Sequence, residues 1–498
     1  MYQAISFAAP AGAALLLTAL LFRGVRTTIA TYFAAGHNVE TVQGAGTIAA
    51  AWIWVVALFF IPWICYQQGL IAFIPFVLCN ALVLVGLAFL APRILEVMPQ
   101  GYTLPGYIGK RDGIMMEALV AVITVAAMAY IALLPLQAAS NLVVYLSGWD
   151  RDTVILALAA LIFIVACPRG LISSIATDIV KLAAVIIIVG LAAVAIAVAL
   201  EKEGAGVLVR GLNGIRPPEA ELFPLGLLLT FVLPSAINLF ASGAMDGMLY
   251  QRLFAVRKVN VRRAFLWGAG IFLFVPLIMG TVGLLVAGLF GNLQLKPGSV
   301  EADLIAFTTI VKLVPQVPHI LFATILIGAI LATAVAALNA ASTVAVNNFI
   351  RPLTLWWSGE DLTDVKAIGI AWGVMLLVLL LATTGARAQW DLFTWWLTAG
   401  AIRAVLLVPI VALILTSPVF LRSAVWWVVV TAIVSTLTYL LATETLVASN
   451  SGLSFYGEVL STVPVSVHRV GVSYASIAAI TTGLLCWGSM WIYRLSKT

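Results

Sequence analysis

The sequence predicts an all-α polytopic membrane protein with about 13 transmembrane helices. Of its 498 residues, 63% are hydrophobic and only 9% are charged, whereas a soluble globular protein averages about 25% charged residues. Apolar runs of about 20 residues, the length that crosses the hydrocarbon core as a helix, recur along the whole chain. The composition therefore excludes an ordinary soluble domain.

The predicted spans are the apolar runs separated by polar residues or by glycine and proline. Ile5 to Phe22 is predicted to be a retained helix, because it lacks the basic start and the small-residue cleavage site of a signal peptide. The spans are 4–23, 42–67, 69–97, 114–146, 150–168, 170–200, 222–246, 263–290, 317–349, 363–386, 388–416, 422–443 and 468–493.

The distribution of basic residues predicts an outside N-terminus and a cytoplasmic C-terminus. With that orientation, sixteen of the 26 Lys and Arg residues face the cytoplasm, eight face outward, and Lys181 and Arg403 lie within spans. Cytoplasmic loops carry the excess of positive charge. The basic run at 252–263 is predicted to be a cytoplasmic loop and not a nucleic-acid-binding patch. The apolar chain predicts the plasma membrane, or the inner membrane of a bacterium.

Other features narrow the function classes. The segment 299–314 is amphipathic and predicts a surface helix over the outer face. The three histidines lie far apart, and no His/Asp/Glu cluster or nucleophile motif is present. The four cysteines lie inside apolar runs without a CxxC pattern. The sequence thus predicts no enzyme and no cofactor.

Asp178 and Lys181 stand out because they lie inside the apolar run 170–200. A charge at membrane depth costs several kcal/mol, so such residues are usually functional. The i, i+3 spacing puts both groups on one face of the helix. They form either a neutralised structural pair or part of a cation pathway.

Five segments together resemble the sodium:solute symporter family, and they follow the family's order over about residues 1–420. Each motif alone is weak, and the resemblance depends on their order. A further segment, 49–69, loosely resembles the urea-permease subgroup. The five segments are TYFAAGHN (31–38), YTLPGYIGKRDG (102–113), RGLISSIATDIVK (169–181), MDGMLYQRLFAVR (245–257) and LNAASTVAVNNFIRPL (338–353).

The resemblance implies two inverted repeats of five helices in one transporter domain. Residues 1–41 would form an extra helix and loop, 42–200 the first repeat, 222–416 the second, and 422–498 two further helices. In such folds the binding site lies near the membrane midplane, where the first helix of each repeat is broken. The small residues at 44–52 and 233–244, with Pro234 and Gly243, predict these breaks.

The family's sodium site combines carbonyl oxygens of the second span with oxygens of the ninth, because unwound backbone coordinates the ion. Where the family commonly has two adjacent hydroxyl residues, this chain has Ala332 and Thr333, so one ligand is missing. By position, the predicted cation-binding set is Ala49, Trp52, Ala329, Ala332 and Thr333.

Asp178 matches the family's aspartate on the cation's route to the cytoplasm, but Lys181 stands where the family has glutamine. A fixed ammonium could replace the sodium ion. It could also bind and release a proton, because burial disfavours the charged form of an amine. The alternative is ordinary sodium coupling through Thr333.

The predicted solute-binding residues are polar or aromatic side chains near the two breaks. An amide in an apolar span needs a polar partner. Arg403 stays charged, so it either pairs with backbone carbonyls or binds a carboxylate of the solute. The predicted set is Trp54, Gln137, Asn238, Phe240 and Arg403.

Together these features predict a secondary active transporter that imports a small polar organic solute with sodium or a proton by alternating access. Its partners would be the solute, the coupling cation and the lipid bilayer, with no nucleic acid. Two alternatives remain: a sodium-independent permease, proton-coupled or uncoupled, with Lys181 in place of the cation, and a transporter-like solute sensor.

Overall fold

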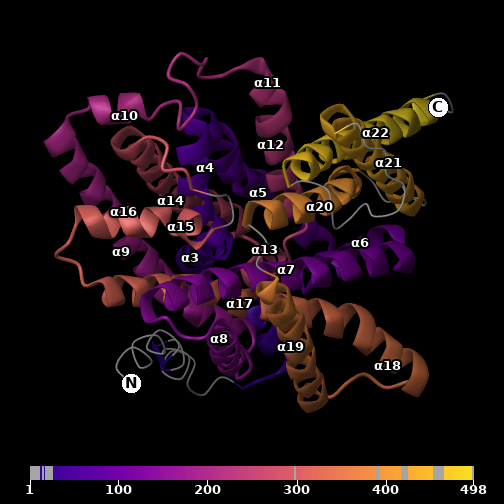
Figure 1. Cartoon of the computed structure of the whole chain (residues 1–498). Helices are drawn as coiled ribbons and strands as arrows, with labels where there is room; N and C mark the ends of the chain where they lie inside the picture. The colour runs from indigo at the N-terminus through magenta and orange to yellow at the C-terminus, as the bar shows by residue number, and fades with distance from the viewer. Residues whose placement is uncertain are drawn as a thin grey trace.

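The computed structural model describes residues 12, 13, 16, 26–295, 299–388, 392–416, 424–451 and 465–495. Within these ranges every regular element is a helix, apart from one isolated bridge between Val39 and Val256. Ten helices of the described chain are long and apolar enough to cross a membrane, or eleven when the bent pair Thr41–Trp52 and Val56–Ala72 counts as one span. The all-α membrane fold is confirmed (Figure 1).

The α-helices follow one another with short connections. In chain order they are α2 (Ile29–Ala34), α3 (Thr41–Trp52), α4 (Ile61–Gln68), α5 (Asn80–Val97), α6 (Leu104–Asp112), α7 (Ile114–Ser147), α8 (Arg151–Ala166), α9 (Leu171–Glu203), α10 (Gly206–Arg210), α11 (Leu225–Leu227), α12 (Leu233–Ala244), α13 (Gly247–Ala255), α14 (Val261–Phe290), α15 (Val300–Asp303), α16 (Ile305–Leu313), α17 (His319–Ala345), α18 (Arg351–Ser358), α19 (Asp364–Arg387), α20 (Leu392–Leu415), α21 (Ala424–Ser451) and α22 (Val465–Leu495).

Eleven of the thirteen predicted spans have a counterpart among the helices that are long and apolar enough to cross a membrane, when the bent pair counts as one. The fifth, α8, is a helix of 16 residues, about 24 Å long at 1.5 Å per residue, which is shorter than a typical hydrocarbon core. The first, 4–23, lies almost entirely outside the described residues. The count of thirteen therefore stays a prediction.

The helix breaks that the sequence predicts in spans 2 and 7 are present, but each lies just beyond the predicted segment. Span 2 is helical through Trp52, becomes non-helical at Ile53, and bends by 62° before it continues. In span 7, Leu233–Ala244 is an unbroken helix with Pro234 in its first turn. The break follows at Met245, and α13 then begins.

The order of elements recurs in the two halves. The broken α3–α4 is followed by α5, α7, α8 and α9, and the broken α12–α13 by α14, α17, α19 and α20. Between the second and third of these helices lies a short helix: α6 in the first half, α15 and α16 in the second. The segment 299–314, predicted as one helix, is helical as the pair α15 and α16, and its place on the outer face stays a prediction.

The core forms around α14 and α17, which pack against helices of the opposite half. α17 contacts α7, α8 and α9, and α14 contacts α3, α4, α5 and α9. A side chain at Gly283 of α14 would come within 2.2 Å of the Pro62 carbonyl oxygen in α4, so only glycine permits this approach. α21 and α22 pack on each other and on α20 at the edge of the bundle (Figure 1).

Candidate cation and solute site

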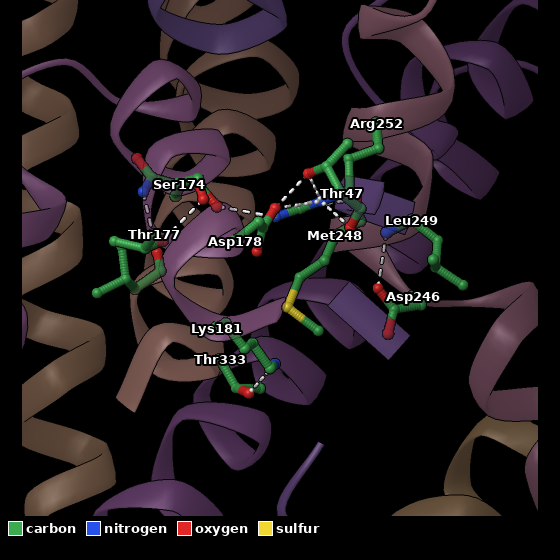
Figure 2. Close-up of polar contacts among 12 residues, drawn as sticks. Thr47, Ser174, Thr177, Asp178, Lys181, Asp246, Met248, Leu249, Arg252 and Thr333 are labelled. Atoms are coloured by element: carbon green, nitrogen blue, oxygen red, sulfur yellow. Dashed lines mark hydrogen bonds and ion pairs between the residues drawn. The ribbon is translucent and has the colours of Figure 1, made fainter. Parts of the chain in front are cut away.

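Lys181 and Thr333 come together in the interior of the protein. Lys181 on α9 donates a hydrogen bond from Nζ to the Thr333 hydroxyl on α17 at 2.7 Å, and each side chain is only 1% exposed. α9 packs against both α3 and α17. The ammonium therefore binds the one hydroxyl that the sequence offers as a side-chain cation ligand (Figure 2).

The other predicted cation ligands are buried, and two of their carbonyl oxygens already accept a backbone hydrogen bond. The Ala49 oxygen accepts from Ile53 at 2.9 Å and the Trp52 oxygen from Trp54 at 3.0 Å. A carbonyl oxygen has two lone pairs, so neither is saturated. Ala329 and Ala332 lie in the middle of α17. Ala332 adds no side-chain oxygen.

Asp178 forms its ion pair with Arg252 and not with Lys181. The carboxylate Oδ2 lies 2.7 Å from Arg252 Nη2, and both side chains are almost completely buried. The predicted alternative of a neutralised Asp178–Lys181 pair is therefore wrong. Helix spacing places Asp178 and Lys181 on one face, but the broken span 7 brings a guanidinium from α13 against that face.

Arg252 also corrects the predicted cytoplasmic loop at 252–263, because it lies inside α13 and is fully buried. Its Nε donates to the Thr47 hydroxyl at 2.9 Å and its Nη2 to the Ser174 hydroxyl at 2.8 Å. Thr47 in turn donates to Asp178. This buried network ties α3, α9 and α13 together (Figure 2).

The two tryptophans at the first break pack on each other. Trp52 and Trp54 are T-shaped with ring centroids 5.3 Å apart. Trp52 donates from Nε1 to the Asn80 side-chain oxygen at 2.8 Å, whereas the buried Trp54 Nε1 has no hydrogen-bond partner among the residues that the structure describes. Trp54 thus retains a free donor, which suits its predicted solute-binding role.

The other predicted solute-binding residues have separate surroundings in the described structure and do not line one shared pocket. Asn238 donates to the Leu397 carbonyl at 3.4 Å and accepts from Ser476 at 3.0 Å, so its amide joins α12 to α20 and α22. Phe240 lines a small apolar cavity with Val83 and other side chains. Gln137 is buried in α7. Their solute-binding roles remain predictions.

Arg403 lies buried in α20, and only one of its nitrogen atoms is used. Nε donates to the Ala399 carbonyl oxygen at 3.0 Å, while Nη1 and Nη2 have no hydrogen-bond partner in the described ranges of the chain. The guanidinium carbon is 5.8 Å from the ring centroid of Tyr130 on α7. The predicted alternative of backbone pairing thus accounts for one donor out of five.

Asp246, which the sequence analysis did not select, lies at the break in span 7. It caps α13 by accepting a hydrogen bond from the Leu249 N–H at 2.9 Å, and it is fully buried. The signal for Asp246 in the sequence was the family-like segment 245–257, which also contains Arg252. Such a motif does not reveal which carboxylate pairs with which cation.

The broken spans of the two halves meet where α13 packs against α3. The pattern that defines the sodium:solute symporter family matches residues 32–425. The chain belongs to the sodium:solute symporter family. This family consists of membrane transport proteins, not enzymes. No curated protein matches the sequence.

Solved structures agree in fold. A substrate-bound, outward-open Na⁺-coupled sialic acid symporter is similar with a TM-score of 0.65 and 15% identity, over 97% of this chain and 98% of that one. MhsT in complex with L-phenylalanine gives 0.55 and 13%, over 90% and 98%. MHP1, a nucleobase-cation-symport-1 family transporter, gives 0.53 and 12%, over 93% and 95%. At these identities the likeness concerns the fold alone.

Proposed function

We propose that this protein is a secondary active transporter that carries a small polar solute in symport with a proton, by alternating access. In this proposal the ammonium of Lys181 takes the place of the sodium ion that the family name implies. The observation that carries it is the buried hydrogen bond from Lys181 to Thr333. The family membership supports symport with a cation.

The partners of the buried charges support a built-in cation. Asp178 is neutralised by Arg252 at 2.7 Å, whereas no ion pair within 4.0 Å joins Lys181 to a carboxylate in the described part of the chain. Lys181 therefore brings a positive charge without an ion-pair partner there, the charge that a sodium ion would bring. Its donor meets a hydroxyl that would otherwise coordinate the ion, while Ala332 lacks the second one.

A fixed ammonium can couple transport only if it gives up its proton during the cycle. Burial disfavours the charged amine, and the contact to Thr333 joins α9 to α17. Separation of these helices would expose the amine to water on one side of the membrane. Proton release there would drive the cycle, and uptake would depend on the pH gradient.

The test is solute uptake into proteoliposomes with an imposed pH gradient or sodium gradient. A panel of amino acids, sugars, nucleobases and urea supplies the solute. The wild type should accumulate its solute with an inward proton gradient and show no stimulation by sodium. Lys181→Gln, which restores the family residue, should abolish the response to pH.

Lys202→Gln is the matched control, because Lys202 ends the same helix but is exposed. It should leave uptake and its pH response unchanged. Saturable sodium stimulation of the wild type, retained in Lys181→Gln, would return the protein to sodium coupling through Thr333. Solute binding without any uptake would favour the sensor.

We also propose that the N-terminus lies outside and the C-terminus inside, which the excess of cytoplasmic Lys and Arg supports. This places the loop after α9 outside and the loop after α18 in the cytoplasm. In a cysteine-free background, Ala205→Cys should react with a membrane-impermeant thiol reagent in intact cells, and Glu360→Cys should not. Both positions are exposed. The reverse labelling pattern would invert the topology.

A further inference from the structure

The guanidinium of Arg403 has more hydrogen-bonding capacity than its surroundings use. The side chain is 1% exposed, and its two terminal nitrogens, Nη1 and Nη2, have no hydrogen-bond partner within the part of the chain that the structure describes. A buried charged donor without a partner is costly. Two parallel N–H donors of a guanidinium match the two oxygens of a carboxylate.

The carboxylate of Asp246 presents the opposite case. Oδ1 caps the N-terminus of α13 by accepting a hydrogen bond from the Leu249 N–H, whereas Oδ2 is buried and accepts no hydrogen bond from any described residue. In Figure 2 this carboxylate lies apart from the Asp178–Arg252 pair, on the other side of Met248. Asp246 is not used by that pair and keeps one acceptor oxygen available.

Asp246 and Arg403 carry opposite charges on neighbouring elements but form no ion pair. Asp246 follows α12 by two residues, α12 packs against α20, and α20 carries Arg403, yet no ion pair within 4.0 Å joins the two side chains in the described part of the chain. The site therefore offers one negative and one positive anchor.

We infer that the solute is a zwitterion, with its carboxylate bound by Arg403 and its ammonium bound by Asp246. The inference rests on the proposed function and specifies its solute. A zwitterion satisfies both anchors and adds no net charge to a buried site. A monoanion or a monocation would satisfy one anchor and leave the other buried charge without a partner, which is costly.

A neutral amide such as urea is the competing solute, because it also carries donors and an acceptor. The two free nitrogens of Arg403 favour a carboxylate over a single carbonyl oxygen. Of these two groups, only the carboxylate has two oxygens that can accept from both nitrogens in the bidentate geometry. Arg403 and Asp246 would then set the specificity of the site.

The test measures ligand-induced thermal stabilisation of the full-length purified protein in detergent. The probes are the twenty standard amino acids, β-alanine, γ-aminobutyrate and glycine betaine. Matched single charges are propionate, butyrate and propylamine, and urea is the neutral probe. At least one zwitterion should stabilise the wild type in a saturable manner, and no single-charge probe or urea should do so.

Two conservative variants separate binding from folding. Arg403→Lys keeps the positive charge but loses the two parallel N–H donors of the guanidinium, so affinity for the zwitterion should fall more than tenfold. Asp246→Asn can still cap α13 through its side-chain oxygen but loses the negative charge. It should weaken zwitterion binding at least tenfold and raise the affinity for the matched monoanion relative to the zwitterion. A merely structural role for Asp246 would not change this preference.

The inference is overturned if no zwitterion binds, if urea binds better, or if both variants keep the wild-type affinity and preference. The proposed function fails separately. If a zwitterion binds through both anchors but its uptake ignores the pH gradient, the solute inference stands and proton coupling does not. If urea is taken up in a pH-dependent manner, the coupling stands and the zwitterion is wrong.

Discussion

Arg252→Gln is expected to lower the free energy of unfolding by about 3–5 kcal/mol, the usual cost of removing one partner from a buried ion pair. The pair with Asp178 is fully buried, with side-chain exposures of 0% and 2%. Removal of the guanidinium leaves the Asp178 carboxylate charged in an apolar interior and also removes donors to Thr47 and Ser174. Denaturation of the purified protein in mixed micelles measures the loss.

Arg210→Gln is the matched control. Arg210 pairs with Glu203 at 3.5 Å, but the two side chains are 55% and 51% exposed, so its loss should cost at most about 1 kcal/mol. The double variant Arg252→Met/Asp178→Leu should recover much of the stability lost in Arg252→Gln, because no buried charge is then stranded. Equal, small losses in the buried and exposed variants would show that the network does not stabilise the fold.

The helical fold and the broken spans could be predicted from the sequence, because both depend on local composition. Runs of apolar residues set the helices, and small residues at 44–52 and 233–244 marked the breaks. The exact break points could not be predicted. Pro234 lies in the first turn of α12, where proline costs little. The helix therefore continues past it and ends at Ala244, and the break is at Met245.

The partners of buried charges could not be predicted, because they depend on how distant helices meet. Asp178 and Lys181 are three residues apart, yet Asp178 pairs with Arg252 and Lys181 with Thr333, which lie 74 and 152 residues away. The absent hydroxyl at Ala332 raised the hypothesis that Lys181 replaces the ion. It did not identify Asp246, because a single acidic residue near a helix break also fits an ordinary helix cap.

The second large effect is expected in how sodium changes the stability of the wild type and of a variant without the Lys181 ammonium. In the wild type, Lys181 binds Thr333 at 2.7 Å, and an added sodium ion would meet an ammonium at the position of its ligand. Two like charges in a buried site exclude each other. The wild type should therefore gain no specific stability from sodium.

The double variant Lys181→Gln/Ala332→Ser restores the family pattern, with the amide in place of the ammonium and two adjacent oxygen side chains on α17. It should gain sodium binding. A ligand at one hundred times its dissociation constant stabilises a protein by about 2.7 kcal/mol, an effect readily seen in a melting curve. Thr333→Val added to this variant should abolish the gain, because it removes one of the two hydroxyls.

The most direct test of the built-in cation is equilibrium binding of radioactive sodium to the purified wild type and to Lys181→Gln/Ala332→Ser, with potassium holding the ionic strength constant. The account predicts no saturable binding to the wild type and one saturable site, lost with Thr333→Val, in the double variant. Saturable sodium binding to the wild type that disappears in Thr333→Val would contradict it, because the ion and the Lys181 ammonium cannot share the same hydroxyl.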